Sequence, residues 1–388
     1  MPRPASLRAL LPLCLTLAAC NPATREVVQT DPDRPAHHAP GGGFRNTQIT
    51  DPSKTLFDYL AMKHFGNHPW ADHAARAAEV PVHPVDMAAI GAPGAAPQVT
   101  WLGHSTFLIQ AGGMAVLTDP VFADRASPFS FAGPRRYVPH VIDYAALPPI
   151  DLVIISHNHY DHLDETAIGI LGNGPRYAVP LGLKAWFTDQ GVAPDRVTEF
   201  DWWDEKTLAG RPVTALPSQH WSARGLGDRR RTLWASWLLE LPGLTLWFAG
   251  DTGYNPVQFK QIGQHVRDKG GAIDLGLIPI GGYLPRSFMG PYHVNPEEAL
   301  YVHRDVGARR SIGMHWGTFP LTAEGPGDPV RDLAAGRDRL GIAPEAFSTM
   351  AVGETRVVQP APDQPAPVQP APVQPARAAR SPSDGANQ

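Results

Sequence analysis

Cysteine is scarce in this chain, and its scarcity limits the chemistry that the protein can use. The 388 residues include two cysteines, Cys14 and Cys20, and both lie close to the N-terminus. The rest of the chain therefore has no internal disulfide, no thiolate ligand for zinc and no thiol nucleophile. Any metal site in the body of the protein must be built from histidine and carboxylate side chains.

A strong excess of basic charge is also lacking. Lys and Arg together number 33 against 37 Asp and Glu, which gives a formal net charge of −4. Nucleic-acid-binding domains usually carry a marked basic excess, so the composition gives no support for a nucleic-acid partner. The 42 prolines and 37 glycines gather in loops and at the ends, which indicates a compact middle with irregular flanks.

The apolar stretch at the N-terminus, residues 9–19, is too short to span a bilayer comfortably. It follows Arg3 and Arg8, and this order is typical of a signal peptide, which we predict over residues 1–19. The residues Leu-Ala-Ala before Cys20 resemble a bacterial lipobox, so we expect cleavage before Cys20 and acylation of its thiol. An ordinary cleaved signal with an incidental cysteine is the alternative.

A lipid anchor at Cys20 predicts a place in the bacterial cell envelope. Several acyl chains would hold the protein on the periplasmic face of a membrane more firmly than one chain can. Asn21 follows the cysteine where an Asp would favour retention at the inner membrane, so an outer-membrane destination is compatible with the sequence. The membrane is therefore a predicted partner of the protein.

Composition divides the mature chain into three parts. Residues 20–43 are rich in Pro, His, Asp and Gly and read as a flexible tether. Residues 44–358 form the predicted folded domain, with an N-terminal arm, helical or irregular, over residues 55–76. Residues 359–388 repeat Gln-Pro-Ala-Pro and are expected to be disordered, since such a segment cannot bury a core.

The run from His157 to His162 carries four metal-binding side chains within six residues. It follows the apolar residues 152–155, which read as a buried strand, so these side chains lie where a strand ends and a loop begins. Imidazole and carboxylate groups suit zinc and similar divalent ions. His157 and His159 can bind one ion, and Asp161 and His162 can reach a second.

Three further candidate ligands also follow apolar runs. They are His220, Asp251 and His315, and small residues such as Gly250 and Gly317 lie beside them. Taken singly, each has an ordinary structural explanation, such as a buried histidine bonded to the backbone. Together with the first motif they complete two metal sites, and the carboxylate of Asp251 could bridge both ions.

Short apolar runs alternate with turn residues through the middle of the chain. Strands are predicted at residues 99–102, 106–110, 115–118, 152–155, 176–179, 213–216, 233–241, 245–249, 275–280 and 311–314. Helices are predicted at residues 182–190, 256–269, 296–306 and 330–340. For the third helix, Asn295 can cap and Pro296 fits the first turn. Strands in runs that then alternate with helices favour a layered α/β sandwich.

Eight stretches carry a resemblance to a known family: WLGHSTFLI (101–109), LTDPVFADRASPFSFAGPRR (117–136), ISHNHYDHLD (155–164), QHWSARG (219–225), TLWASW (232–237), FAGDTGY (248–254), YHVNPEEA (292–299) and MHWGTF (314–319). In this order they resemble the metallo-β-lactamase superfamily. Within it they are most similar to the N-acylphosphatidylethanolamine-hydrolysing phospholipases D and their bacterial relatives. The resemblance implies an α/β fold, the four-layer αββα metallo-β-lactamase sandwich, and makes residues 44–358 the predicted hydrolase domain.

The resemblance also implies the ligand sets. One zinc ion takes His157, His159, His220 and Asp251, and the other takes Asp161, His162, Asp251 and His315; Mn or Fe in place of zinc stays open. Relatives that use one Cys ligand to hydrolyse β-lactams are disfavoured, because the body of this chain has no cysteine. The family's additional active-site histidine falls on His293.

The implied activity is cleavage of an N-acylphosphatidylethanolamine-like phospholipid by a metal-bound hydroxide. Asp161 and His293 are the predicted catalytic residues, and Tyr160 and Tyr254 are possible contacts of the substrate headgroup. His104 is expected to support the loops of the site. A lactonase or other ester or phosphodiester hydrolase on the same scaffold stays open, as does a non-catalytic envelope protein.

Two groups of residues near the motifs each admit two interpretations. The basic cluster of residues 229–231 could meet a lipid phosphate, although a solvated loop is the favoured interpretation. Trp202, Trp203 and Trp221 could line an apolar entrance, and a role in the core or at the rim fits them equally well.

Overall fold

Two seven-stranded sheets form the centre of the protein. The computed structural model describes residues 35–358. The predicted signal peptide over residues 1–19, the acylation of Cys20 and the tail over residues 359–388 lie outside the described residues. Within residues 35–358, no helix combines the length and the hydrophobicity that crossing a bilayer requires.

The first sheet has the strand order β14-β1-β2-β3-β4-β5-β6. Strands β1 to β3 form an antiparallel meander, and β3 to β6 are parallel. Its strands are β1 (Gln98–Gly103), β2 (Thr106–Ala111), β3 (Met114–Thr118), β4 (Leu152–Ile154), β5 (Arg176–Pro180), β6 (Val197–Phe200) and β14 (Thr355–Val357).

The second sheet repeats this plan with the order β13-β12-β11-β10-β9-β8-β7. Strands β7 to β10 are antiparallel, and β10 to β13 are parallel. Its strands are β7 (Glu205–Leu208), β8 (Arg211–Leu216), β9 (Ser236–Leu241), β10 (Leu244–Phe248), β11 (Leu275–Pro279), β12 (Arg310–Met314) and β13 (Phe347–Ser348).

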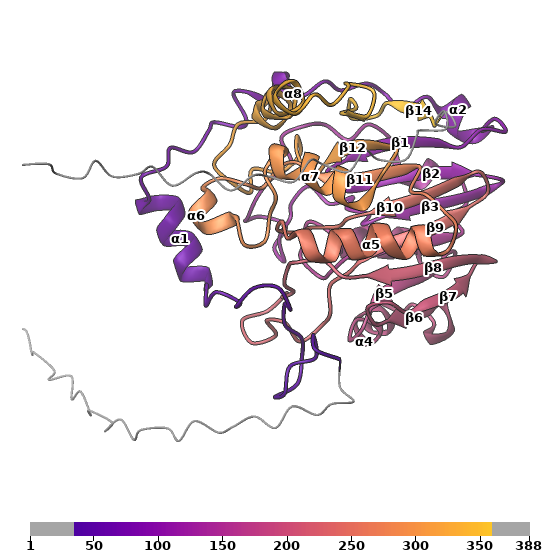
Figure 1. Cartoon of the computed structure of the whole chain (residues 1–388), viewed down its shortest axis with the longest axis horizontal. Coiled ribbons are helices and arrows are strands. Elements are labelled where there is room, and N and C mark those ends of the chain that lie inside the picture. Colours follow the sequence, from indigo (N-terminus) through magenta and orange to yellow (C-terminus); the bar gives the residue numbers. More distant parts are fainter. Residues whose placement is uncertain (1–34, 359–388) are drawn as a thin grey trace, which may run out of the picture.

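Helices cover the outer faces of both sheets. The first sheet carries α2 (Met87–Gly91), α3 (Glu165–Leu171) and α4 (Lys184–Asp189), whose apolar side chains pack on its outer face. The second carries α5 (Pro256–Asp268), α7 (Pro296–Val306) and α8 (Asp328–Leu340), and Figure 1 shows α5 and α7 across the near face. The predicted four-layer αββα sandwich is therefore confirmed.

Alternation along the strands builds these layers. Phe107 on β2 points between the two sheets, where it shares a core with Phe248 of β10, while the next residue, Leu108, points to the helical side. Leu108, Val153 and their neighbours on the first sheet are fully buried, because helices cover the face that they point to. Burial on both faces makes the sandwich a rigid support for the loops at its edge.

The start of α7 agrees with the sequence prediction. The side chain of Asn295 accepts a hydrogen bond from the backbone N–H of Glu298, and the Glu298 carboxylate accepts one from the backbone N–H of Asn295. Pro296 occupies the first turn, and the helix ends at Gly307 in the left-handed conformation. This capping box fixes the helix that directly follows His293.

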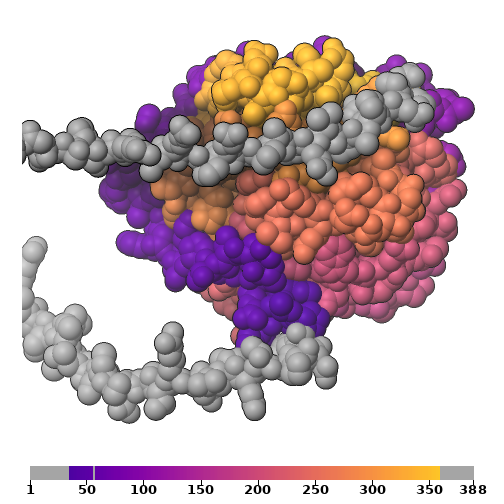
Figure 2. All heavy atoms as spheres, in the orientation of Figure 1, coloured from indigo at the N-terminus to yellow at the C-terminus, as the bar shows by residue number. Residues whose placement is uncertain are grey.

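The N-terminal part of the described chain runs along the surface of the sandwich, in indigo in Figure 2. Residues 35–43, assigned to the tether from their composition, lie against the body: the ring of His37 stacks on Trp202, and the adjoining Phe44 donates a backbone hydrogen bond to Arg230. The predicted arm contains α1 (Leu56–Phe65), and Tyr59 donates a hydrogen bond to the carbonyl of Leu321. A short helix, α6 (Arg286–Met289), lies between β11 and α7.

Candidate metal centre

Strands of both sheets end at one edge of the sandwich. Strand β8 is antiparallel to β9, and β9 is antiparallel to β10, so β8, β10 and β12 all run in the same direction. Strand β4 leads into His157 and His159, β8 into His220, β10 into Asp251, and β12 into His315. The topology therefore brings together side chains that are far apart in the sequence.

Three imidazoles form a first cluster. Nε2 of His157 lies 2.8 Å from Nδ1 of His159, and Nε2 of His220 lies 3.3 Å from the same atom. Burial lowers the pKa of His159 and of His220 to about 3, and it lowers the pKa of His157 well below its usual range. Each ring is therefore neutral at pH 7 and keeps one nitrogen lone pair for a cation.

Asp161, His162 and His315 form a second cluster. Oδ2 of Asp161 lies 3.3 Å from Nε2 of His162 and 3.3 Å from Nε2 of His315. Nε2 of the buried His104 lies 3.0 Å from the same oxygen. This contact fits the supporting role expected for His104, because it holds the carboxylate of Asp161 in place.

The carboxylate of Asp251 lies between the two clusters. Its Oδ2 is 3.2 Å from Nε2 of His162 and 3.0 Å from Nε2 of His315. The same oxygen is 3.8 Å from Nε2 of His220 in the first cluster. Asp251 is thus the one carboxylate of the set within 4 Å of nitrogens from both clusters, which is the position that a bridging ligand needs.

The buried carboxylates of Asp161 and Asp251 favour positive charge at this centre. Burial raises the pKa of Asp251, but the charges of His162 and His315 outweigh burial and hold that pKa well below its usual range. Burial lowers the pKa of His315, but Asp251 and Asp161 outweigh it and raise the pKa to about 9. Protons on His162 and His315 neutralise the carboxylates here, and a divalent cation can replace them.

Unpaired buried atoms test whether the residues fit a metal. Nε2 of His162, Nε2 of His315 and Oδ1 of Asp251 form no hydrogen bond among residues 35–358, although both nitrogens face the carboxylate of Asp251. A buried polar atom without a hydrogen bond costs about 1–3 kcal/mol, so three in one place favour a compensating ligand. Nitrogen and carboxylate donors without sulfur suit zinc and similar divalent cations. The residue set therefore fits metal binding.

Hydrogen bonds behind the clusters orient the rings. Nδ1 of His162 lies 2.7 Å from Oδ2 of Asp119, and Nδ1 of His220 lies 3.0 Å from the carbonyl of Tyr292. With Nδ1 occupied, Nε2 of each ring faces the centre. The sequence analysis did not single out Asp119. It directly follows β3, so the rule that found Asp251 after β10 would have found it too.

Arg224 ties the metal-binding loop together from behind. Its Nη1 donates hydrogen bonds to the carbonyls of Asn158 and Leu163, at 3.1 and 2.6 Å, on either side of Tyr160 and Asp161. Its guanidinium lies over the ring of Tyr160, with 4.0 Å between the guanidinium carbon and the ring centroid. We infer that Arg224 is a positioning residue for the loop.

We expect Arg224→Met to weaken metal binding by about 10–100-fold, as losses in the layer behind metal ligands do. Methionine fills the space but leaves two carbonyls of the loop without donors. The dissociation constant is measured by competition with a chelator. Arg125→Met is the matched control, because Arg125 also joins two backbone carbonyls, those of Ser130 and Gly133, in an exposed loop. Unchanged affinity in a folded Arg224→Met protein would contradict the role.

His293 lies beside the clusters, at the end of the turn that follows α6. Its Nδ1 is 3.9 Å from Oδ2 of Asp251 and has no hydrogen-bond partner among the described residues. Burial lowers the pKa of His293 to about 3, so the ring is neutral at pH 7. It is therefore placed to act on a group bound at the centre.

The two tyrosines predicted as substrate contacts have different surroundings. The hydroxyl of Tyr160 donates to the carbonyl of Arg224, within the loop that carries the ligands. The hydroxyl of Tyr254 donates to Asp305 near the end of α7, and its ring stacks on Phe259. Neither hydroxyl is bonded to a proposed metal ligand, and their contact with substrate stays a prediction.

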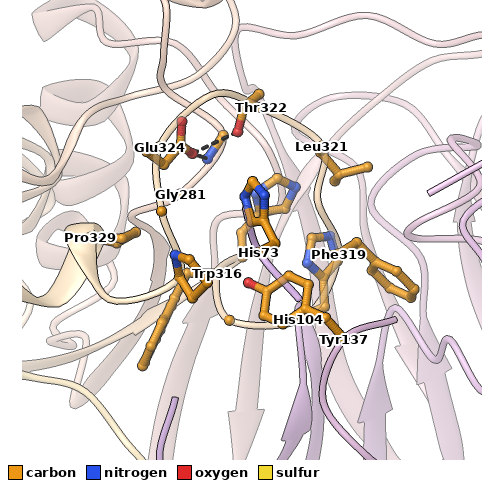
Figure 3. A pocket seen from close by; sticks show the side chains of 15 residues that line it. His73, His104, Tyr137, Gly281, Trp316, Phe319, Leu321, Thr322, Glu324 and Pro329 are labelled. Atoms are coloured by element: carbon orange, nitrogen blue, oxygen red, sulfur yellow. Dashed lines mark hydrogen bonds between the residues drawn. The ribbon is translucent and has the colours of Figure 1, made fainter. Parts of the chain in front are cut away.

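A small cavity lies behind His104 and His315, and Figure 3 shows the side chains that line it. Its volume is about 20 Å³, which is room for one water molecule and not for a substrate. Nδ1 of both histidines has no hydrogen-bond partner among the described residues, so a water there could serve one or both. Substrate must reach the clusters from another side.

The basic cluster and the tryptophans are mostly occupied by contacts within the protein. The guanidinium of Arg229 lies 3.8 Å above the ring of Trp221, and Arg230 forms an ion pair with Asp51. Trp221 packs edge-on against His159, which places it beside the first cluster. Trp202 is buried, whereas Trp203 is 41% exposed. Of the three tryptophans, Trp221 is the one in contact with a candidate ligand of this centre.

Comparison with known proteins agrees with this geometry. Residues 115–316, about half of the chain, match the model of the beta-lactamase superfamily domain. The chain is 44% identical over 269 residues to N-acyl-phosphatidylethanolamine-hydrolyzing phospholipase D 1 of Caenorhabditis elegans, covering 66% of this chain and 74% of that protein.

Two further similarities are weaker or shorter. The mitochondrial N-acyl-phosphatidylethanolamine-hydrolyzing phospholipase D of Saccharomyces cerevisiae is 37% identical over 58% of this chain and 48% of its own length. A possible metal-dependent hydrolase from Veillonella parvula superposes with a TM-score of 0.54 at 17% identity, over 68% of this chain and 100% of that one, and shows the fold alone. The chain thus belongs to the metallo-β-lactamase superfamily and is a metal-dependent hydrolase of that fold.

Proposed function

We propose that this protein is a phospholipase D-type phosphodiesterase that cleaves N-acylphosphatidylethanolamine-like phospholipids with two zinc ions. The observation that carries the proposal is the position of Asp251 between two clusters of imidazole nitrogens. The similarity to a phospholipase D over 74% of that relative's length supports the substrate class. One ion is assigned to His157, His159, His220 and Asp251, and the other to Asp161, His162, Asp251 and His315.

Cations bound in this centre would acidify a water molecule towards neutral pH and offset the negative charge that grows in the transition state. The chain's own residues orient the reactants. The carboxylate of Asp161, held by His104, accepts a hydrogen bond from the attacking water. Hydroxyl oxygen adds to phosphorus, the bond from phosphorus to the headgroup oxygen breaks, and the headgroup leaves as an alcohol after protonation.

His293 acts at the leaving group in this proposal. Its ring is neutral at pH 7, so it donates a hydrogen bond to a phosphate or leaving oxygen instead of adding a positive charge. The proton that the attacking water gives up is passed to the leaving oxygen on this side of the centre, so the headgroup departs as an alcohol. This step uses the ring nitrogen that has no partner within the described residues.

We expect His293→Gln to lower kcat by about 10²-fold or more, which is the usual contribution of a positioned proton-transfer group. The metal content should stay that of the wild type, because His293 is not an assigned ligand. Steady-state kinetics and elemental analysis of the same sample measure both. A parallel loss of metal would make His293 a ligand and remove its assigned role.

Surfaces near the centre also favour a lipid substrate. A hollow of about 510 Å³ shares His73 and Tyr137 with the small cavity behind His104. It is lined by the cations Lys63, Arg135 and Arg136, by Asp72 and by Trp70, and because it adjoins the closed side of the centre it would meet a membrane surface rather than the scissile bond. Large apolar side chains are exposed on α1 as well, with Phe57 and Phe65 more than three-quarters uncovered.

The deciding experiment compares substrates with the purified, zinc-loaded chain. N-acylphosphatidylethanolamine in vesicles is tested beside a lactone panel and a cyclic-nucleotide panel, with Asp251→Asn as the inactive control. We expect phosphatidic acid and N-acylethanolamine, and in heavy-oxygen water the label should enter the phosphatidic acid, since attack is at phosphorus. Hydrolysis of a lactone without phospholipid cleavage would sink the proposal.

The anchor and the location belong to the same proposal. Acylation of Cys20 would hold the centre at a membrane, on the periplasmic face of the bacterial envelope, where phospholipid is the surrounding material. These features lie in residues outside the described part of the chain and stay predictions.

A further inference from the structure

A second cluster of imidazole and carboxylate groups lies away from the metal centre. Nε2 of His37 is 2.5 Å from Oδ1 of Asp201, and Nε2 of His38 is 2.7 Å from Oδ2 of the same carboxylate. The three potential ligand atoms lie within 4.8 Å of one another. His37 and His38 come from the N-terminal segment, while Asp201 directly follows β6, so the cluster joins two distant parts of the chain.

The charge of Asp201 has no permanent partner nearby. Within residues 35–358, the ion pairs of Asp201 are with His37 and His38, and neither Lys nor Arg takes part. Its side chain is 22% exposed, and those of His37 and His38 are 8% and 20% exposed. The carboxylate is therefore partly withdrawn from water and faces two rings that carry charge only when protonated.

We propose that His37, His38 and Asp201 bind a divalent transition-metal cation such as zinc, separate from the catalytic centre. Two imidazole nitrogens and one carboxylate form a ligand set that zinc accepts, with water as the fourth ligand on the exposed side. Tetrahedral zinc keeps its nitrogen and oxygen ligands roughly 3.3 Å apart, so the side chains must open by less than about 1 Å. Similar close spacing occurs in the catalytic centre, where Nε2 of His157 lies 2.8 Å from Nδ1 of His159.

The surroundings hold the ligands in position. The ring of His37 stacks on Trp202, with 4.3 Å between the centroids, and the backbone N–H of Trp202 donates to Oδ1 of Asp201. His38 is fixed by a backbone bridge to Phe44. These contacts limit the movement of both rings, which lowers the entropy that a bound cation would have to offset.

A cation at this place would fasten the N-terminal segment to the body close to the catalytic centre. Phe44 donates a backbone hydrogen bond to the carbonyl of Arg230, and the side-chain amide of Asn46 donates a hydrogen bond to the carbonyl of His220, a predicted catalytic ligand. The same segment thus contacts both Asp201 and the backbone of His220. The proposed site is structural, and it supports a loop of the catalytic centre without entering it.

The test counts metal in the full chain. The protein is stripped with a chelator, reloaded with zinc, dialysed and measured by elemental analysis. We expect Asp201→Asn to hold one zinc ion fewer per chain than the wild type, and zinc to raise its melting temperature by roughly 2–4 °C less. Asp124→Asn is the matched control, because Asp124 pairs with a single histidine, His140, and should keep the wild-type zinc content.

A second pair of variants separates this site from the catalytic one. Asp251→Asn should retain one zinc ion that the double variant Asp251→Asn, Asp201→Asn loses. Equal zinc content in these two proteins would reduce the cluster to a hydrogen-bonded contact and overturn the proposal. If the variants do not fold, crystals of the wild type grown with stoichiometric zinc test the site directly. Absence of an anomalous peak among His37, His38 and Asp201 would also overturn the proposal.

Discussion

Asp251→Asn is expected to lose both the metal of the catalytic centre and turnover. The amide keeps the shape of the side chain but removes the negative charge that lies within 4 Å of His162, His220 and His315. Loss of a group behind a metal ligand costs about 10–100-fold in metal affinity or activity, so loss of the proposed bridge should lower kcat/KM by more than about 100-fold. Elemental analysis and phospholipid hydrolysis on one preparation measure the two effects.

The control for this variant is Asp305→Asn. Asp305 is a partly buried carboxylate that accepts a hydrogen bond from Tyr254 and takes no part in either cluster. An asparagine oxygen can accept the same bond, so metal content and activity should match the wild type. Full activity in Asp251→Asn, with Asp305→Asn behaving normally, would refute the bridging assignment and with it the two-metal arrangement.

The candidate ligands could be predicted from the sequence because a local rule places them. Each comes within a few residues of the end of an apolar run, and strands that run in the same direction end at the same edge. His220, Asp251 and His315 follow this rule one at a time, without knowledge of their neighbours. The sheet topology then brings the rings of His220 and His315 within 4 Å of one carboxylate oxygen, Oδ2 of Asp251.

Contacts that depend on tertiary structure could not be predicted in this way. The meeting of His37 and His38 with Asp201 spans more than 160 residues, and nothing local to either segment indicates the other. Strand β9 begins at Ser236, later than predicted, because Leu233 and Ala235 bond instead to Leu181 and Ser156 in other parts of the fold. In both cases distant backbone and side-chain partners override the local pattern.

Edge strands were missed for a related reason. Strand β7 (Glu205–Leu208) begins Glu-Lys-Thr and has one fully buried residue, Leu208, because it lies at the edge of its sheet. Strand β14 (Thr355–Val357) contains an arginine and exists through its pairing with β1. An apolar run marks a strand that is covered on both faces, so strands with solvent on one side leave a weaker pattern.

The buried carboxylate of Glu324 holds the loop that passes beside His293 and His315. It accepts hydrogen bonds from the backbone N–H groups of Gly282, Tyr283 and Leu284 and from the hydroxyl of Thr322. A Cβ added at Gly282 would lie 3.0 Å from Nδ1 of His293, so the loop packs directly on that ring. Glu324 therefore links the stability of the loop to the geometry of the centre.

Glu324→Ala should lower the free energy of unfolding by about 3–5 kcal/mol, because three backbone N–H groups lose their acceptor and a buried unpaired donor costs about 1–3 kcal/mol. Glu324→Gln keeps one oxygen acceptor and should lose less. Glu345→Ala, at an exposed position, should stay within about 0.5 kcal/mol of the wild type. Urea unfolding of the metal-free proteins measures all three. A loss of less than about 1 kcal/mol in Glu324→Ala, where about 3 kcal/mol or more is expected, would mean that water replaces the carboxylate and that the loop does not depend on it.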